Sequence, residues 1–519
     1  MLRQGNADSG TQTAAVIRLT PGPEAEAGPL LPDGPQQAPI QNQAPDSDTA
    51  GHARRQPNLP LLPQRVCSLD GSGYATDYAQ LLLTSLGMHV RRAYRTSDAH
   101  PAIAWQRSGA MALTGRVAGP PQMCPLPLAS CAEGALAAYA AIAGADIAAR
   151  LPGATVLSER AALVGLRRNG AIAPGGNCRL LPAADGWLAL SLAREQDWAL
   201  LPAWLETQLG SSWDAVAAAV VERSTAQLLE QGRLLGLAVA RAASPAQSPA
   251  AWHAVTLETG TDCAASDRQH PLVIDLSSLW AGPLCSHLLQ LAGASVIKVE
   301  SRQRPDGARS GNAAFYNLLN GGKASVALDF ASPRGREELH QLLRKADIVI
   351  EASRPRALRQ LGIDAEALLA EHPGLTWVSI TGYGRAEPQA NWIAYGDDAG
   401  VAAGLTGVMC AVGAEPVFCS DAIADPLTGL HAAVAALASY RGGGGRLIAL
   451  SLHDVVSHCA HFEMPDTPEA LRHRCLDWQA IAQTAGLQDL LPTARVAPVD
   501  ARPLGADTLA ILASMRIAC

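Results

Sequence analysis

The feature of this sequence with the clearest chemical potential is an aspartate before a proline at the start of a long apolar helix. Residues 427–440 are Ala-rich and apolar, which predicts a buried helix. Asp425 and Pro426 predict its start, with Asp425 as the N-cap and Pro426 as the first helical residue. Backbone N–H groups and the helix dipole keep an N-cap carboxylate ionised, so it can act as a nucleophile without a neighbouring base. Taken alone, the same residues favour an ordinary helix cap over a nucleophile.

Composition limits the class of protein and its partners. The 519 residues are 48% hydrophobic and 17% charged, enough for two or three domain cores. A net charge of -7 gives no reason to expect nucleic acid or an anionic membrane as a partner. The eleven Cys are scattered without a C-x-x-C pair, and no apolar export signal opens the chain. We therefore expect a cytoplasmic protein without disulfides.

Familiar cofactor and hydrolase motifs are missing. No G-x-G-x-x-G follows Leu276, no G-x-S-x-G occurs, and residues 321–325 lack the glycine that a P-loop needs before its lysine. The His and Cys residues between His453 and Cys475 fit no standard metal spacing. The sequence predicts no metal and no permanently bound cofactor.

An internal repeat organises the chain. The strand, turn and helix pattern of residues 65–87 recurs at 271–293, an offset of 206 residues. Residues 127–143 match 422–438 at an offset of 295, which aligns Ser130 with Asp425. Because the offset grows between the two matches, the first copy must lack part of its middle. The pattern predicts a degenerate duplication.

The second copy predicts the fold class. Apolar strands at 272–276, 295–300, 324–328, 348–350 and 377–380 alternate with helices, which is typical of an α/β protein with a doubly wound parallel sheet. Ligands of such sheets bind at the carboxyl ends of the strands.

Three further segments complete the organisation. Residues 1–60 have the composition of a disordered tail. Residues 170–245 predict a small α+β domain with two strands turning at Asp185-Gly186, and 246–270 predict a linker.

Motifs in the second copy resemble the family III CoA-transferases, often called CaiB/BaiF, over nearly all of residues 271–460. Their order and spacing carry the resemblance. The matching segments are 273–276 with 281–283, 293–300, 305–309, Asn320 with 323–329, Glu351 with 354–355, 361–362, 379–384, 394–395 and 424–429. The resemblance implies a large CoA-transferase domain at 271–462, a truncated copy of it at 61–165, and a shortened connection with a returning C-terminal segment at 463–519.

The resemblance also implies a reaction and its residues. Asp425 would be the nucleophile that moves CoA between an acyl-CoA and a free carboxylic acid, through an aspartyl anhydride and an aspartyl-CoA thioester. Arg354 would pair with phosphate. The residues that the resemblance implies around CoA are Trp280, Ala281, Ser301, Leu328, Asp329, Arg354, Ala357, Thr381 and Tyr395.

Two alternative functions stay open. Related racemases use a His beside the position of Tyr395, and no His occurs there, so a transferase is favoured over an acyl-CoA racemase or isomerase. The second alternative is a non-catalytic CoA-binding protein, because the first copy lacks much of its domain.

Members of this family form interlocked dimers in which a small domain faces the large domain of the other chain. Here the first copy keeps a small domain but has Ser130 in place of the nucleophile, whereas the second keeps Asp425 and has only residues 463–491 in place of a small domain. We therefore expect either a homodimer or a monomer that acts as an internal pseudo-dimer with one working site. Gly175-Gly176 is then either a lid over Asp425 or a plain turn.

Overall fold

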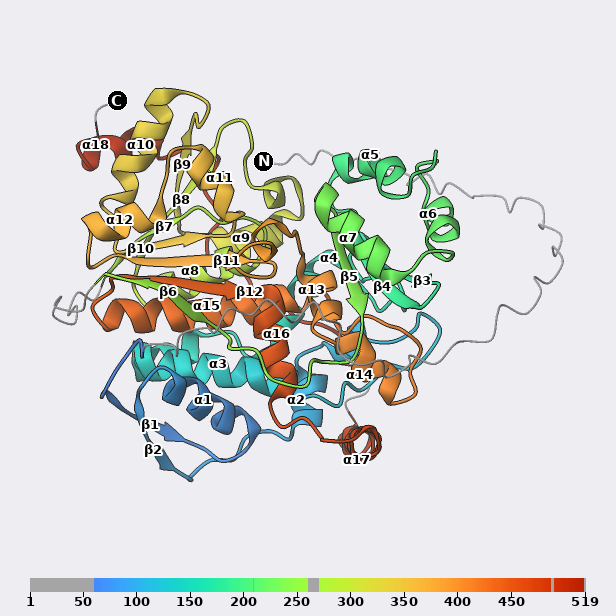
Figure 1. Ribbon diagram of the computed structural model, residues 1–519. Helices are drawn as coiled ribbons and strands as arrows, with labels where there is room; N and C mark the ends of the chain where they lie inside the picture. Colours follow the sequence, from blue (N-terminus) through green and yellow to red (C-terminus); the bar gives the residue numbers. More distant parts are fainter. Residues whose placement is uncertain (1–59, 209, 260–269, 487–489, 518–519) are drawn as a thin grey trace, which may run out of the picture. The chain divides into compact units, whose positions relative to one another are not determined.

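The computed structural model describes residues 60–517, apart from 209, 260–269 and 487–489 (Figure 1). The predicted tail at 1–60 lies outside this part of the chain, except for its last residue. Within the described residues, no helix combines the length and the apolar character needed to cross a bilayer.

The main sheet has the doubly wound order. Its strands are β7 (Leu272–Asp275), β8 (Ser295–Ser301), β9 (Ala324–Leu328), β10 (Ile348–Glu351), β11 (Thr376–Thr381) and β12 (Arg446–Ser451). They are parallel and lie in the order β12-β11-β10-β7-β8-β9, which reverses between β7 and β10. The predicted α/β class with a doubly wound parallel sheet is confirmed. Its ligand crevice belongs at that reversal, beyond the carboxyl ends of β7 and β10.

Two helical layers bury the sheet because successive strand residues point to opposite faces. Val273 and Ile350 contribute to the core that contains α8 (Ala281–Leu291) and α15 (Ala424–Arg441). Ile274 and Val349 contribute to the core on the other face, under α10 (Pro333–Leu343) and α12 (Ala365–Glu371). Burial on both faces explains why these strands are continuously apolar instead of alternating.

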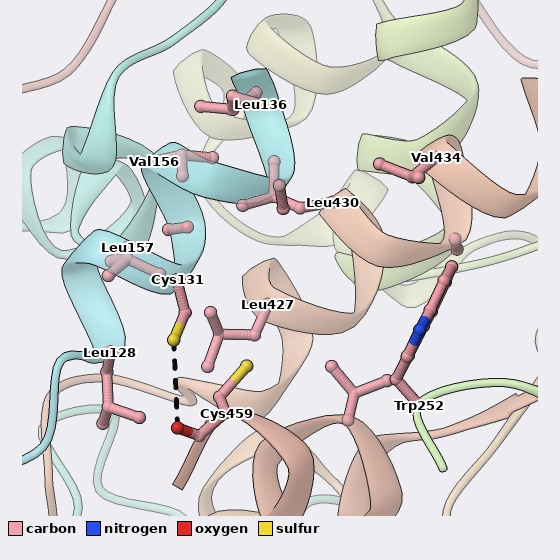
Figure 2. Packing of buried hydrophobic residues seen from close by; sticks show 14 of the residues in the cluster. Leu128, Cys131, Leu136, Val156, Leu157, Trp252, Leu427, Leu430, Val434 and Cys459 are labelled. Carbon is pink, nitrogen blue, oxygen red and sulfur yellow. Dashed lines mark hydrogen bonds between the residues drawn. The ribbon is translucent and has the colours of Figure 1, made fainter. Parts of the chain in front are cut away.

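The first copy of the repeat consists of few elements. They are β1 (Val66–Asp70), α1 (Tyr74–Ser85), β2 (His89–Ala93) and α3 (Leu128–Ala143), and β1 and β2 form a separate two-stranded parallel sheet. Helix α3 packs against both α1 and α15 (Figure 1). Figure 2 shows Leu128 and Leu136 of this half on one side of the core and Leu427 and Leu430 of α15 on the other. The two halves of the chain therefore share one hydrophobic core.

The strand pairs of the two copies have the same register. Val66 lies opposite His89 in the first copy, and Leu272 lies opposite Ser295 in the second. Leu272 lies 206 positions after Val66, and Ser295 lies 206 positions after His89. This is the offset of the repeat predicted from the sequence.

The helix crossings also correspond. A Cβ added to Gly134 on α3 would lie 2.5 Å from the Ala75 carbonyl oxygen of α1. A Cβ added to Gly429 on α15 would lie 2.7 Å from the Ala281 carbonyl oxygen of α8. The glycines are 295 residues apart and the alanines 206, which are the two offsets of the repeat. In both copies a helix crossing this close requires glycine.

The small domain has a three-stranded antiparallel sheet. Strands β3 (Cys178–Ala183) and β4 (Gly186–Ser191) turn at Asp185-Gly186 as predicted, and β5 (Ala238–Ala242) adds a third strand that the sequence did not reveal. Helices α5 (Glu195–Trp204), α6 (Trp213–Val220) and α7 (Thr225–Leu235) precede β5.

Part of the predicted linker is a strand. Residues Ala254–Glu258 form β6, which pairs antiparallel with β12 at the edge of the main sheet. Glu258 also accepts a hydrogen bond at 3.1 Å from the Nε of Arg446. This short strand stands in a mostly polar segment, and a polar segment suits an edge strand as well as a linker. The sequence therefore predicted only a linker here.

The remaining helices connect the layers or close the chain. They are α2 (Pro101–Arg107), α4 (Glu159–Val164), α9 (Ala313–Asn320), α11 (Pro355–Gln360), α13 (Gly396–Ala402), α14 (Leu405–Ala411), α16 (Leu452–His461), α17 (Pro468–Thr484) and α18 (Thr508–Ser514). Residues 463–491, which stand where a second small domain would be, consist mostly of helix α17.

Candidate active site

Helix α15 begins two residues earlier than the sequence predicted. Its N-cap is Ile423, so Asp425 is the second helical residue and Pro426 the third, and the Asp425 side chain does not cap the helix. The prediction of Asp425 as N-cap is wrong. Ser420 and Ala422 have positive φ values of 62° and 43° and bend the chain sharply before the helix. Pro426 still fits the first turn, because an N–H group there would have no partner within the helix.

The Asp425 carboxylate lies against the first residues of α13. A Cβ added to Gly396 would lie 2.3 Å from Asp425 Oδ2, so glycine is needed for this approach. A hydrogen bond with the Gly396 backbone favours the ionised carboxylate. The next residue, Asp397, accepts a hydrogen bond at 2.8 Å from the Ala422 N–H, which fixes α13 to the turn before α15.

Two more charged residues complete the surroundings of Asp425. Asp421 is fully buried and accepts two hydrogen bonds from Arg160, one of them at 2.8 Å from Nε. Arg160 is in α4, in the N-terminal half of the chain. Three carboxylates and one guanidinium therefore share this site.

Burial and like charges shift the titration of this cluster. Burial raises the pKa of Asp425 to about 7; Arg160 opposes this shift, and Asp397 and Asp421 add to it. Burial and Asp421 similarly raise the pKa of Asp397 to about 6. The expectation that Asp425 is fully anionic at pH 7 is therefore wrong. Near neutral pH a large part of it is protonated.

Arg160 lies between the acidic cluster and the residues that follow β7. Its guanidinium lies 5.4 Å from the ring centre of Trp280, at the start of α8. Its Nη2 would lie 3.2 Å from a Cβ added to Gly175, so the predicted lid or turn at Gly175-Gly176 lies beside it. Although burial disfavours its charge, the carboxylates of Asp421, Asp397 and Asp425 raise the pKa of Arg160 above its ordinary value. Nothing in the sequence marked this arginine.

Most residues predicted around CoA lie at the carboxyl edge of the sheet. Trp280 and Ala281 follow β7 and are buried, with Trp280 packed edge-to-face on Phe315 at 5.2 Å. Ser301 ends β8, and its hydroxyl donates to Gln303 at 3.0 Å. Gln303 in turn donates to Asp329, just after β9, at 2.5 Å.

The other predicted residues differ in how open they are to a ligand. The Leu328 side chain is fully buried, so it cannot contact a ligand. Thr381 is engaged locally, because its hydroxyl accepts from the Gly384 N–H at 2.9 Å. Ala357 is partly exposed on α11, and Tyr395 is partly exposed as the N-cap of α13, next to Gly396.

A cluster of arginines surrounds Arg354, beyond β10. Burial and the positive charges of Arg356, Arg194 and Arg304 lower the pKa of Arg354 below its ordinary value. Arg194 is bound to Asp197, at 2.9 Å from its Nε. The guanidinium groups of Arg304, Arg354 and Arg356 form no hydrogen bond or ion pair with any residue that the structure describes. Such uncompensated charge favours binding of a multiply charged anion.

A cavity of about 780 Å³ opens beside these arginines. It is lined mainly by α5, together with Gly210, Ser211 and Arg304. The small domain and the loop after β8 thus enclose it within one chain.

Two of the His residues near the C-terminus form hydrogen bonds with backbone carbonyl groups. His461 bonds the carbonyl oxygens of Ser457 at 2.7 Å and Ala246 at 2.6 Å, and His458 bonds that of Ala250 at 3.1 Å. No set of three or more His, Cys, Asp or Glu side chains in the described ranges is arranged to hold a metal ion.

Comparison with known proteins identifies the domain that carries this site. Residues 270–479 match the family model of CoA-transferase family III. Over 215 residues the chain is 33% identical to a succinate–glutarate CoA-transferase from Agrobacterium fabrum, covering 37% of this chain and 53% of that protein. Over 205 residues it is 28% identical to a formyl-CoA:oxalate CoA-transferase from Escherichia coli O6:H1, covering 37% and 49%.

A solved CAIB/BAIF family protein from Brucella suis is 29% identical, covers 43% of this chain and 58% of that one, and has a TM-score of 0.33. The chain spans about half the length of the curated relatives that it matches. The predicted resemblance is confirmed over residues 270–479, which are similar to CoA-transferase family III.

Proposed function

We propose that this protein transfers CoA from an acyl-CoA to a free carboxylic acid, with Asp425 as the nucleophile. The observation that carries the proposal is the position of Asp425. Within a family III domain, its carboxylate is enclosed by α13 and Arg160, and Arg160 lies over Trp280 at the crevice of the sheet.

The chemistry needs only the Asp425 carboxylate. It attacks the thioester carbonyl of the donor and releases CoA thiolate, which leaves an aspartyl-acyl anhydride. The thiolate then attacks the aspartyl carbonyl, which releases the donor acid and leaves an aspartyl-CoA thioester. The acceptor carboxylate attacks this thioester, which releases CoA thiolate again and forms a second anhydride. CoA thiolate then takes the new acyl group, and Asp425 is free again.

The charge distribution supports an orientation for the substrate. The phosphates of CoA would lie among Arg304, Arg354 and Arg356, where positive charge has no partner among the described residues. Tyr395 lies between this cluster and Asp425, because it interacts with Arg354 and directly precedes Gly396. The pantetheine arm would therefore pass Tyr395 and Trp280 to bring the thioester to Asp425.

The internal duplication would give each chain one complete site. The matching registers and glycine contacts of the two copies support a fused pseudo-dimer. Ser130, at the position of Asp425 in the first copy, is fully buried and cannot reach a substrate. The N-terminal half instead contributes Arg160, and Gly175-Gly176 would close the site beside it.

The arginine cluster gives a binding prediction. Arg356→Gln, at an exposed residue, should weaken CoA binding about 10-fold, because one charge-assisted phosphate contact is lost. Binding of 4′-phosphopantetheine, which lacks the nucleotide, should change less. Isothermal titration calorimetry measures both. Arg334→Gln, at an exposed arginine on α10, is the control and should bind CoA as the wild type does. Equal affinities for CoA in all three proteins would place the nucleotide elsewhere.

Trapping of the intermediate tests the function itself. The protein is incubated with a panel of acyl-CoAs, quenched with hydroxylamine and mapped by peptide mass spectrometry. We expect a hydroxamate on Asp425 and transfer of CoA to an added carboxylic acid. CoA binding without any modification at Asp425 would refute the proposal and favour a non-catalytic protein. Epimerisation of a chiral 2-methylacyl-CoA without an acceptor acid would favour an isomerase.

A further inference from the structure

We propose that Arg160 binds the carboxylate of the acceptor acid and is a specificity-determining residue of the site. This inference rests on the proposed CoA-transferase function and names a part of it that the family domain does not contain, because Arg160 lies outside residues 270–479.

The acceptor faces an electrostatic obstacle in this site. It is an anion, and it must approach a position enclosed by the carboxyl groups of Asp397 and Asp421 as well as that of Asp425. Like charges in a site with little water repel strongly. Of the charged groups that face Asp425 from the described elements around it, Arg160 is the cation. Binding of a carboxylate at the Arg160 guanidinium would offset the repulsion.

Arg160 has free hydrogen-bonding capacity for this role. A guanidinium carries five N–H donors in one plane. Nε and Nη2 bond Asp421, whereas Nη1 forms no hydrogen bond with any residue that the structure describes. The side chain is 28% exposed, in contrast to the fully buried Asp421. Asp421 thus holds the guanidinium in place while its free edge stays open to a ligand.

The location of Arg160 also suits the acceptor. One face of its guanidinium covers Trp280, at the carboxyl end of β7, and Asp421 precedes Asp425 by four residues. A carboxylate on the free edge of Arg160 would thus lie between the crevice and the nucleophile. Gly175 leaves space there, because a Cβ at this position would come within 3.2 Å of Nη2.

Comparison of a charged and an uncharged acceptor tests the role of Arg160. In Arg160→Gln, KM for the carboxylic acid that gives the fastest wild-type transfer should rise about 10-fold or more, because a charge-assisted contact is lost. At a pH above the midpoints of both proteins, the rate of hydroxamate formation with neutral hydroxylamine should fall less than 3-fold, and KM for the acyl-CoA should change little. Arg167→Gln, at a nearby exposed arginine, is the control and should leave all three values unchanged.

A second variant keeps the test independent of folding defects. The groups that shift the pKa of Asp425 are Arg160, Asp397, Asp421 and the Gly396 backbone. Loss of the cation therefore raises this pKa, whereas loss of one of the anions lowers it. The pH midpoint of hydroxamate formation should rise in Arg160→Gln and fall in Asp421→Asn. Damage to the fold would not shift the two midpoints in opposite directions.

The outcomes separate the two proposals. If the wild type forms no hydroxamate at Asp425, the transferase function fails. If the wild type forms it and Arg160→Gln slows the hydroxylamine and carboxylate reactions equally, only the role of Arg160 is overturned. Shifts of both pH midpoints in the same direction would also overturn it.

Discussion

Replacement of Asp425 by alanine should lower the rate of CoA transfer by roughly 10⁴-fold or more, as expected when a covalent nucleophile is removed. CoA should still bind with nearly wild-type affinity, because the arginines proposed to hold its phosphates are on other elements. Steady-state transfer rates and calorimetric CoA affinities measure the two effects separately. Turnover that survives in Asp425→Ala would reject the mechanism.

The internal repeat provides a matched control for this variant. Ser130 occupies the corresponding position in the first copy, is fully buried, and has no hydrogen-bond partner for its hydroxyl. Ser130→Ala should therefore leave both transfer and stability close to wild-type values. A large loss of activity in this variant would point to a working site in the first copy.

The pH dependence of the wild type follows from the same carboxyl group. The anion of Asp425 attacks the thioester, and its pKa is raised to about 7. Transfer should therefore increase as pH rises from 5 to 8, with a midpoint near 7. The nearby Asp397 titrates in the same range, so the midpoint describes the acidic cluster as a whole.

Alanine at the two crossing glycines, Gly134 and Gly429, should destabilise the protein by about 1–3 kcal/mol each, the usual effect of overpacking. Helix propensity alone predicts the opposite sign, because alanine is favoured over glycine by about 1 kcal/mol within a helix. The steric term should dominate, since the added Cβ would lie 2.5 Å or 2.7 Å from a backbone carbonyl oxygen that cannot rotate away. Urea unfolding monitored by circular dichroism gives the free energies of unfolding.

The two glycine variants should differ in activity. Gly429 lies close to the carbonyl oxygen of Ala281, which follows Trp280. Because an added Cβ would displace these residues, Gly429→Ala should slow transfer as well. Gly134 contacts only the first copy and should affect stability alone. Gly153→Ala is the control, since its Cβ would meet no atom within 4 Å. Wild-type stability in both crossing variants would contradict the close packing of α3 on α1 and of α15 on α8.

Local pattern in the sequence was sufficient for the five main-sheet strands between Leu272 and Thr381. The strands from Leu272 to Thr381 were found because apolar runs of strand length alternate with helical periodicity. The offsets of 206 and 295 residues found in the sequence also separate matching positions in the strand register and in the helix crossings. Strands β5, β6 and β12 were missed: β5 and β12 closely follow helices, and β6 is a five-residue edge strand within a polar segment.

The acidic cluster, in contrast, exists only in three dimensions. Arg160 and Asp397 are ordinary charged residues in the sequence, and folding brings them from two other segments to Asp425 and its near neighbour Asp421. The pKa of Asp425 depends on how much water these segments exclude and on the distances between their charges. The sequence therefore indicated the nucleophile through its helix and its family motif, whereas long-range packing set its ionisation and supplied its cation. Neither burial nor charge distance can be read from the sequence for Arg160, which lies 265 positions before Asp425, or for Asp397, which lies 28 positions before it.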